Sequence, residues 1–297
     1  MKYLSVAEIA KKWGVAERTV RNYCAQGKIP NAFLTGKTWN IPEYTVRPKR
    51  AKKKVKEPSN LLEQLILEKE NKQKGGIYHK IQIELTYNSN HMEGSTLTHD
   101  QTRYIFETNT IGIENTSINV DDIVETANHF LCIDTIIDYA KSNITEKLIK
   151  DLHRILKNGT SDSRKGWFVV GDYKKLPNEV GGQETVSPSN VKKEIKKLLL
   201  SYNQIKNKTI EDIIEFHYHF ESIHPFQDGN GRIGRLLMFK ECLKYNYVPF
   251  IIGEKTKLFY YRGLKEWKSN KGYLMDTCLL AQDQFKLYLD YFKIPYV

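Results

Sequence analysis

Residues 224–235 read HPFQDGNGRIGR, and no other stretch of the 297-residue chain carries as much chemical information. Glycines on both sides of Asn230 allow the backbone N–H groups to line a concave turn that binds anions. An apolar helix follows directly, so its positive N-terminal end adds to the same place. The stretch therefore predicts a phosphate-binding site at the start of a helix.

Charged side chains of the same stretch fit that prediction. Arg232 and Arg235 are three residues apart on the first turn of the helix, so both can reach phosphate oxygens. Asp228 is a hard oxygen ligand, the kind that Mg²⁺ requires. Pro225 ends the preceding helix and leaves His224 at its tip, where it can act as a general base. One segment thus combines a base, a metal ligand, an anion-binding turn and two cations.

The stretch matches the Fic signature H-P-F-x-D-G-N-G-R-x-x-R at each fixed position, and residues 60–290 resemble Fic proteins. The resemblance implies an AMP transferase that uses ATP and Mg²⁺, places AMP on a Tyr, Ser or Thr hydroxyl of a target protein, and releases pyrophosphate. His224 would deprotonate that hydroxyl, and Asp228 would hold Mg²⁺. The other signature residues would bind phosphates: Gly229, Asn230 and Gly231 the α- and β-phosphates, Arg232 the β-phosphate and Arg235 the γ-phosphate.

Two further segments resemble elements of the family. Residues 167–171 predict a short strand followed by polar turns. This hairpin resembles the flap that clamps a target by strand addition and borders the nucleotide, which implies nucleotide contacts from Val170, Gly171, Asp172 and Tyr173. Tyr260 stands where the family commonly places an adenine-pocket tyrosine. Lys268 stands about where relatives often have a nucleotide-contacting asparagine, and this departs from the family pattern.

Residues 89–94, SNHMEG, resemble the inhibitory motif [ST]-x-x-x-E-[GN] of Fic proteins. They end an expected inhibitory helix near 77–94, and Ser89 and Glu93 lie on one helical face because they are four residues apart. The resemblance implies that Glu93 pairs with Arg235, keeps it from the γ-phosphate and leaves ATP in a non-productive pose. Some inhibited relatives also reverse the reaction, so de-AMPylation is an alternative.

Residues 1–46 predict a small separate domain. Ser5 and Glu8 have the spacing of a capping box, and Gly14 separates two helical segments, which is typical of a helix-turn-helix. A hairpin or wing is expected at 32–41. The segment resembles excisionase-like winged helix-turn-helix domains, which implies DNA contact through the outward face of the second helix, at Arg18, Arg21 and Asn22. A helical domain that docks another protein is the alternative.

Net charge is distributed unevenly along the chain. Residues 1–58 hold 14 Lys and Arg against 4 Asp and Glu, whereas the rest of the chain holds 32 against 31. Residues 47–58, RPKRAKKKVKEP, have the composition of a solvated basic linker. A polyanion such as DNA would therefore meet the N-terminal part of the protein.

From residue 59 onward, helical periodicity dominates, so the fold class is mainly α. We expect a helical Fic-fold bundle over 59–297 with a β-hairpin flap, preceded by the winged helix-turn-helix domain. The expected helices of the bundle are 60–74, 77–91, 98–106, 120–142, 145–158, 191–202, 210–223, 231–246, 257–267 and 273–292.

Several classes of protein are excluded by composition. No stretch approaches the roughly 18 consecutive apolar residues of a membrane helix, and the N-terminal residues lack an apolar signal-peptide core. The four cysteines lie far apart, which favours buried free thiols in a reducing compartment. We therefore expect a cytoplasmic protein without membrane contact. The oligomeric state stays open, and a homodimer is one option.

Other functions fit parts of the pattern. A DNA-binding regulator with a nucleotide-sensing Fic body would bind DNA without transferring AMP. Kinase-like phosphate transfer is carried out by toxins with a related fold, but such toxins typically lack the intact G-N-G-R segment. His217 and Glu221 are four residues apart yet belong to no H-E-x-x-H pattern, so zinc is disfavoured. Residues 166–171 have the glycine spacing of a P-loop, but Asp172 replaces the required lysine.

Overall fold

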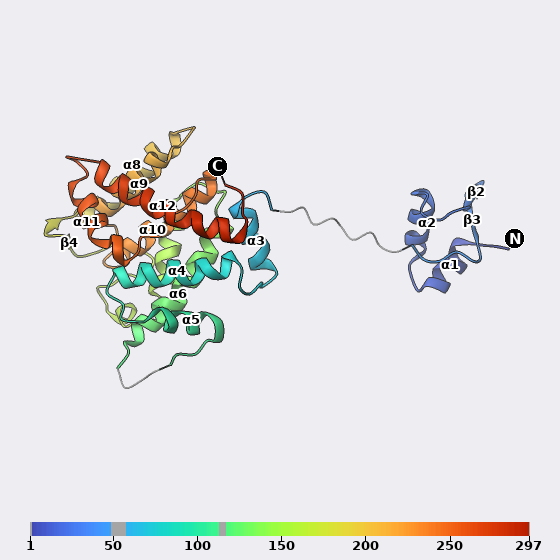
Figure 1. The fold of residues 1–297 in the computed structure, drawn as a ribbon, viewed down its shortest axis with the longest axis horizontal. Helices are drawn as coiled ribbons and strands as arrows, with labels where there is room; N and C mark the ends of the chain where they lie inside the picture. Colours follow the sequence, from blue (N-terminus) through green and yellow to red (C-terminus); the bar gives the residue numbers. More distant parts are fainter. Residues whose placement is uncertain (1, 49–57, 113–116, 297) are drawn as a thin grey trace. The chain divides into compact units, whose positions relative to one another are not determined.

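The computed structural model describes residues 2–48, 58–112 and 117–296. The chain divides into two compact units, Met1–Glu57 and Pro58–Val297, called here the first and the second unit (Figure 1). No helix in the described ranges has the length and hydropathy to cross a membrane. All four cysteines are free and buried, which confirms the expectation for them.

The first unit combines two helices with a small antiparallel sheet. Its elements are β1 Tyr3–Leu4, α1 Val6–Trp13, α2 Glu17–Ala25, β2 Phe33–Thr35 and β3 Thr38–Pro42, with strand order β1-β3-β2. The predicted capping box of Ser5 and Glu8 is present, and Gly14 ends α1 at a φ of 64°. The expected wing at 32–41 is the β2–β3 hairpin. Residues 49–57 of the linker predicted at 47–58 lie outside the described residues.

The second unit is a bundle of helices, as predicted. They are α3 Leu61–Glu70, α4 Ile77–Met92, α5 His99–Thr108, α6 Val120–Asp138, α7 Glu146–Lys157, α8 Pro188–Gln204, α9 Ile210–Ile223, α10 Asn230–Tyr245, α11 Lys257–Glu266 and α12 Gly272–Phe292. Among these helices, α8 differs most from its predicted first residue: it was expected to begin at residue 191 and begins at Pro188. Pro188 occupies its first turn, where a missing N–H costs nothing.

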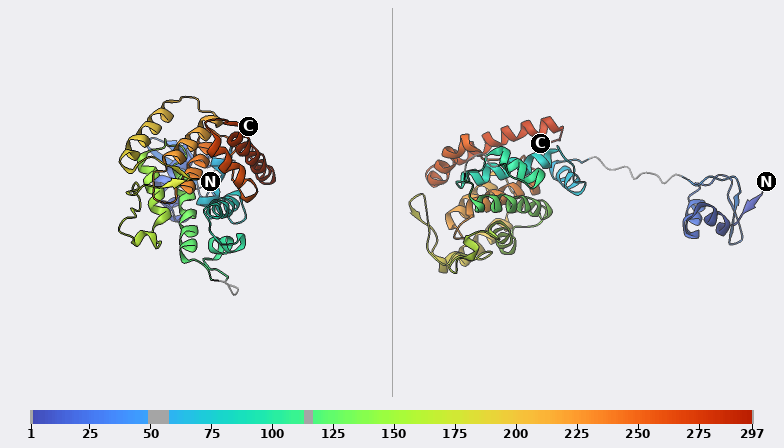
Figure 2. Two further views of the ribbon diagram at one scale, coloured as in Figure 1. Left: turned by 90° about the vertical axis from the view of Figure 1, so that its left-hand side faces the viewer. Right: turned by 90° about the horizontal axis from the view of Figure 1, so that it is seen from below.

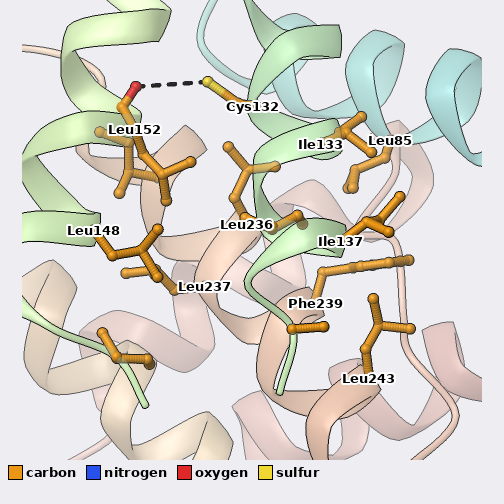
Figure 3. Close-up of a cluster of buried hydrophobic side chains, with 14 of the residues drawn as sticks. Leu85, Cys132, Ile133, Ile137, Leu148, Leu152, Leu236, Leu237, Phe239 and Leu243 are labelled. Carbon is orange, nitrogen blue, oxygen red and sulfur yellow. Dashed lines mark hydrogen bonds between the residues drawn. The ribbon is translucent and has the colours of Figure 1, made fainter. Parts of the chain in front are cut away.

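The centre of the second unit is α10, whose residues 230–243 are all buried. It packs against α9, α6 and α4, and a helix covered on every side is typical of a core. Figure 3 shows Leu236 and Phe239 of this helix among apolar side chains of α4, α6 and α7. Cys132 of α6 donates its thiol proton to the carbonyl of Leu152 on α7, with 3.5 Å between sulfur and oxygen. The signature helix is therefore held rigidly by the core.

The prediction of a strand at residues 167–171 is wrong. These residues form turns, because Phe168 is buried against the ring of His153 instead of entering a sheet. The hairpin lies further along the chain, as β4 Glu179–Val180 and β5 Gln183–Glu184, and stands out from the edge of the second unit (Figure 2). Its two turn glycines have φ of 58° and 75°, which is the requirement of a type I′ hairpin turn.

Candidate active site

A cleft of about 1420 Å³ opens on the second unit beside the start of α10. It is bounded by the β4–β5 hairpin on one side and by α11 on another. Its polar lining comes from five segments, with Glu93 after α4, Glu179 and Thr185 from the hairpin, Glu221 and His224 at the end of α9, Arg235 on α10 and Tyr260 on α11. The structure therefore gathers much of the predicted site in one place.

The loop between α9 and α10 is fixed by its own backbone and by Asn230. His224 ends α9 with a φ of 51° and donates its backbone N–H to the carbonyl of Phe220 at 3.0 Å. Phe226 is fully buried, and its N–H donates to Asn230 Oδ1 at 2.8 Å while Asn230 Nδ2 donates to the Phe226 carbonyl at 2.9 Å. Gly229 adopts a φ of 83° and is the N-cap residue directly before α10. The side chain of Asn230 therefore shapes the loop, while the first N–H groups of α10 are the donors that no helix can satisfy internally.

His224 is neutral over a wide pH range. Burial lowers the pKa of its imidazole to about 4, and the nearby Lys174 ammonium acts in the same direction. Its Nδ1 atom is buried without a hydrogen-bond partner among the described residues. A neutral imidazole in a cleft can accept a proton from a bound hydroxyl.

Arg235 is held by the end of α4. Its Nη2 group donates to Glu93 Oε1 at 2.7 Å and to the Ser89 carbonyl at 2.9 Å, and its Nε–H donates to Ser89 Oγ at 3.1 Å. The arginine side chain is only 4% exposed. A Cβ atom at Gly231 would come within 2.3 Å of Glu93 Oε1, so glycine at this position makes room for the carboxylate. The predicted pairing of Glu93 with Arg235 is therefore present.

Arg232 and Asp228 belong to a second ionic cluster, which sequence reasoning missed. Arg232 donates to Asp228 Oδ2 at 3.0 Å and, through its other terminal nitrogen, to Glu125 of α6. Lys157, the last residue of α7, donates to Asp228 Oδ2 at 2.7 Å, to Asp162 at 3.0 Å and to Glu125. Both signature arginines thus contact carboxylates from outside the signature.

Asp228 is the member of this cluster that could hold a divalent cation. Its side chain is 44% exposed, compared with 12% for Glu125 and 23% for Asp162. Burial opposes ionisation of Asp228, but Arg232 and Lys157 hold the pKa of its carboxyl well below the usual range. Among the described residues, no group of three His, Cys, Asp or Glu side chains is arranged to hold a metal. Mg²⁺ commonly binds through one carboxylate together with substrate phosphates and water, so Asp228 suits it.

Tyr260 lines the cleft from α11 and is almost fully buried. Its hydroxyl shares a hydrogen bond of 2.6 Å with Nε2 of His217. Burial lowers the pKa of His217 to about 3, so this imidazole is neutral and packs in the core. Burial raises the pKa of Glu221 to about 8, so the neighbouring carboxyl is neutral at pH 7. Lys268 also lines the cleft.

The flap was expected at the wrong residues. Val170, Gly171, Asp172 and Tyr173 do not line the cleft. Gly171 donates its N–H to His153 Nδ1 at 2.8 Å, and Lys150 forms an ion pair of 2.9 Å with Asp172. Residues 179–181 and 183–186 line the cleft instead. The sequence did contain a usable signal for the hairpin, since a Gly-Gly pair strongly favours a two-residue turn.

In the first unit, Arg18, Arg21 and Asn22 are exposed along α2. Arg21 forms an ion pair with Glu17 at 2.9 Å, whereas Arg18 has no hydrogen bond or ion pair within the described residues. These three side chains keep the outward position that the sequence predicts, away from the core of Ile9, Val20 and their neighbours.

Residues 143–242 match the model of the Fic/DOC family. The protein adenylyltransferase Fic of Drosophila melanogaster is 31% identical over 188 residues, which covers 60% of this chain and 36% of that protein. The protein of the same name from Drosophila grimshawi is 29% identical over the same coverage. The chain thus spans about a third of the length of these relatives.

Solved structures show the same fold. A Fic domain containing signaling protein from Bacteroides thetaiotaomicron has a TM-score of 0.61 at 24% identity, covering 77% of this chain and 94% of that one. Fic-1 from C. elegans has a TM-score of 0.59 at 22% identity, covering 77% of this chain and 69% of that one. The signature loop, the helical bundle and the family match agree. The chain therefore carries a Fic/DOC family domain, matched over residues 143–242.

Proposed function

We propose that this protein is an adenylyltransferase that moves AMP from ATP to a Tyr, Ser or Thr hydroxyl of a target protein, and that Glu93 inhibits it. The observation that most directly supports this proposal is that His224 and Arg235 line the same cleft, while Nη2 of Arg235 is bound to Oε1 of Glu93 at 2.7 Å. Curated relatives named protein adenylyltransferase support the proposed reaction.

The proposed step begins with His224, whose neutral imidazole accepts the proton of the target hydroxyl. The hydroxyl oxygen then forms a bond to the α-phosphorus of ATP. The bond from that phosphorus to the bridging oxygen of the β-phosphate breaks, and pyrophosphate leaves. Reactions of this kind depend mainly on alignment and on charge neutralisation, which a rigid loop on a buried helix provides.

The remaining residues position the phosphates. The backbone N–H groups at the start of α10, from the N-cap residue Gly229 and from Asn230 and Gly231, would bind the α- and β-phosphates, and Arg232 the β-phosphate. Arg235 would bind the γ-phosphate once Glu93 releases it. Mg²⁺ held by Asp228 would neutralise phosphate charge. Tyr260 would border the adenine, and the β4–β5 hairpin would meet the target chain by strand addition.

The position of the radioactive label in ATP tests the reaction class. Compared with the lysate alone, a Glu93→Gly variant should add protein label from α-³²P-ATP and add none from γ-³²P-ATP, because AMP transfer retains only the α-phosphorus. Label that the variant adds from γ-³²P-ATP would instead mean phosphate transfer. Release of AMP from already modified protein would favour the reverse reaction, de-AMPylation.

A second proposal concerns the first unit, which we infer binds DNA through α2. The observation that favours it is the exposed row of Arg18, Arg21 and Asn22 on a helix that precedes a small wing. Phosphate contacts from such a basic unit supply sequence-independent affinity, and an exposed helix can enter the major groove.

Fluorescence anisotropy with a labelled duplex of about 30 base pairs tests DNA binding over a salt series. Arg18→Ala should weaken binding several-fold and reduce the slope of log affinity against log salt by about one. Lys286→Ala, on α12 of the second unit, is the control and should change neither. Binding that is absent at low salt, or equal in both variants, contradicts the proposal.

A further inference from the structure

Lys174 is a buried lysine between the β4–β5 hairpin and the signature loop. Only 4% of the surface of this residue is exposed to solvent. Within the described part of the chain, no carboxylate lies within ion-pair distance of its ammonium. Lys157 and Lys240, which are buried as deeply, both pair with carboxylates. A buried cation without an anionic partner is costly, so its surroundings must compensate through hydrogen bonds.

Those hydrogen bonds join the two sides of the active site. The Lys174 ammonium donates to Asn178 Oδ1 at 2.6 Å and Thr185 Oγ1 at 2.6 Å, one residue on each side of the hairpin. It also donates to the carbonyl of Ile223 at 3.4 Å, and the backbone N–H of Lys174 donates to the carbonyl of Pro225 at 2.9 Å. Lys174 therefore connects the hairpin base to Ile223 through its side chain and to Pro225 through its backbone, on the two sides of His224.

Neighbouring groups extend the same connection. Asn178 Nδ2 donates to the Phe226 carbonyl at 3.0 Å, and the N–H of Leu176 donates to Gln227 Oε1 at 3.3 Å. The base of the hairpin is thus bound to the three consecutive residues Pro225, Phe226 and Gln227, and to Ile223 on the other side of His224. This differs from the tip of the hairpin, where Val180 is 43% exposed.

We propose that Lys174 is a positioning residue, which ties the base of the hairpin to the loop that carries His224 and places a positive charge beside that imidazole. The inference rests on the proposed function of His224 as the general base. Through the hydrogen bonds, Lys174 sets where a target chain lies relative to the imidazole. Through its charge, it keeps the imidazole unprotonated and ready to accept a proton.

The charges around His224 give the electrostatic effect its sign. Burial favours the neutral imidazole, and the Lys174 ammonium opposes protonation. The Glu93 and Asp228 carboxylates, and the backbone of Glu221, act in the opposite direction. Burial lowers the pKa of Lys174 to about 8, so its ammonium is charged at neutral pH. Removing that charge should raise the pKa of His224 from about 4 toward its ordinary value.

Three variants separate the two roles. Lys174→Met removes both the charge and the three side-chain hydrogen bonds, whereas Thr185→Val removes one hydrogen-bond partner and keeps the charge. Lys175→Met is the matched control, because this neighbouring lysine is exposed. Lys174→Arg retains the charge and should leave the pKa of His224 low. Lys174→Gln removes the charge and keeps a polar end, so it replaces Lys174→Met if the methionine variant does not fold.

The charge effect is measured by titrating the imidazole of His224 by NMR, which does not require an active enzyme. The His224 signal is the one that disappears in His224→Ala. Lys174→Met should raise the pKa of His224 by about one unit, while Thr185→Val and Lys175→Met should leave it unchanged. Hydrogen exchange of residues 176–185 should accelerate about 5- to 10-fold in both Lys174→Met and Thr185→Val. In a Glu93→Gly background, the acid limb of the pH–rate profile should move with the NMR value.

A pKa of His224 that shifts equally in Lys174→Met and Lys175→Met would overturn the electrostatic role. Unchanged hydrogen exchange in Lys174→Met and Thr185→Val would overturn the tie between hairpin and loop. Both readouts are independent of transfer, so a protein that transfers no AMP would refute the proposed function and leave this test intact.

Discussion

Replacing Glu93 by glycine should raise the initial rate of AMP transfer by about 10- to 100-fold. Hydrogen bonds between charged groups contribute about 1.5–3 kcal/mol, and each 1.4 kcal/mol is a factor of ten. Glu93 Oε1 accepts such a bond from Arg235 at 2.7 Å in a site where the arginine is only 4% exposed. Without the carboxylate, the terminal nitrogen of Arg235 can contact the γ-phosphate instead.

The measurement is transfer of label from α-³²P-ATP to protein, at fixed protein concentration. Ser89→Ala should raise the rate only a few-fold, because it removes one of three hydrogen bonds to Arg235 and leaves Glu93 in place. Glu254→Gly is the matched control, since this exposed carboxylate lies 3.5 Å from His91 and does not contact a signature arginine. If Glu93→Gly and Glu254→Gly are equally active, Glu93 does not inhibit the reaction.

The structure also suggests why removing Glu93 leaves the fold intact. Glu93 is the residue after α4, with no helical turn depending on it, and Gly94 beside it already has a φ of 95°. The end of α4 remains held by the hydroxyl of Tyr261, which donates to the Met92 carbonyl at 3.1 Å. A gain of activity in Glu93→Gly can therefore be attributed to Arg235 and not to general loosening.

Local patterns explain what could be predicted from the sequence. Residues 224–235 are contiguous, so glycine placement, the helix start and the arginine spacing can all be read from one stretch. The bundle helices follow from apolar periodicity, and α9 has the predicted bounds. Glu93 and Arg235 are 142 residues apart, and only the family resemblance could join them before the structure did.

Non-local contacts explain what could not. Glu125 and Lys157 are ordinary charged residues of two helices, and nothing in their spacing indicates that both contact the same signature residues. Lys174 stands in a run of polar turn residues beside Lys175, and only its burial distinguishes the two lysines. The misplaced strand at 167–171 has a related cause, because an apolar run buried by a neighbouring helix has the same composition as a strand.

Replacing His224 by alanine in the Glu93→Gly background should lower AMP transfer by about 10²- to 10⁴-fold, the usual contribution of a general base. Binding of ATP should persist, because the residues proposed to bind phosphate are those of 229–235 and the Asn230 hydrogen bonds to Phe226 do not involve the imidazole. His99→Ala is the control, as His99 is a half-exposed histidine that pairs with Glu84 away from the cleft.

The pH profile adds a second condition to this prediction. Because burial and Lys174 lower the pKa of His224 to about 4, the imidazole is already neutral above about pH 5. Because the Glu93 carboxylate raises this pKa, the imidazole of Glu93→Gly should titrate at or below about 4. In this variant kcat/KM should therefore fall only at such low pH, and should not change near the ordinary histidine value of about 6.5. In His224→Ala this acid limb should disappear together with the rate. A variant that keeps transferring AMP, or an acid limb that survives without the imidazole, would assign the base to another group. Loss of both rate and limb, with ATP still bound, is the result that the geometry of the cleft requires.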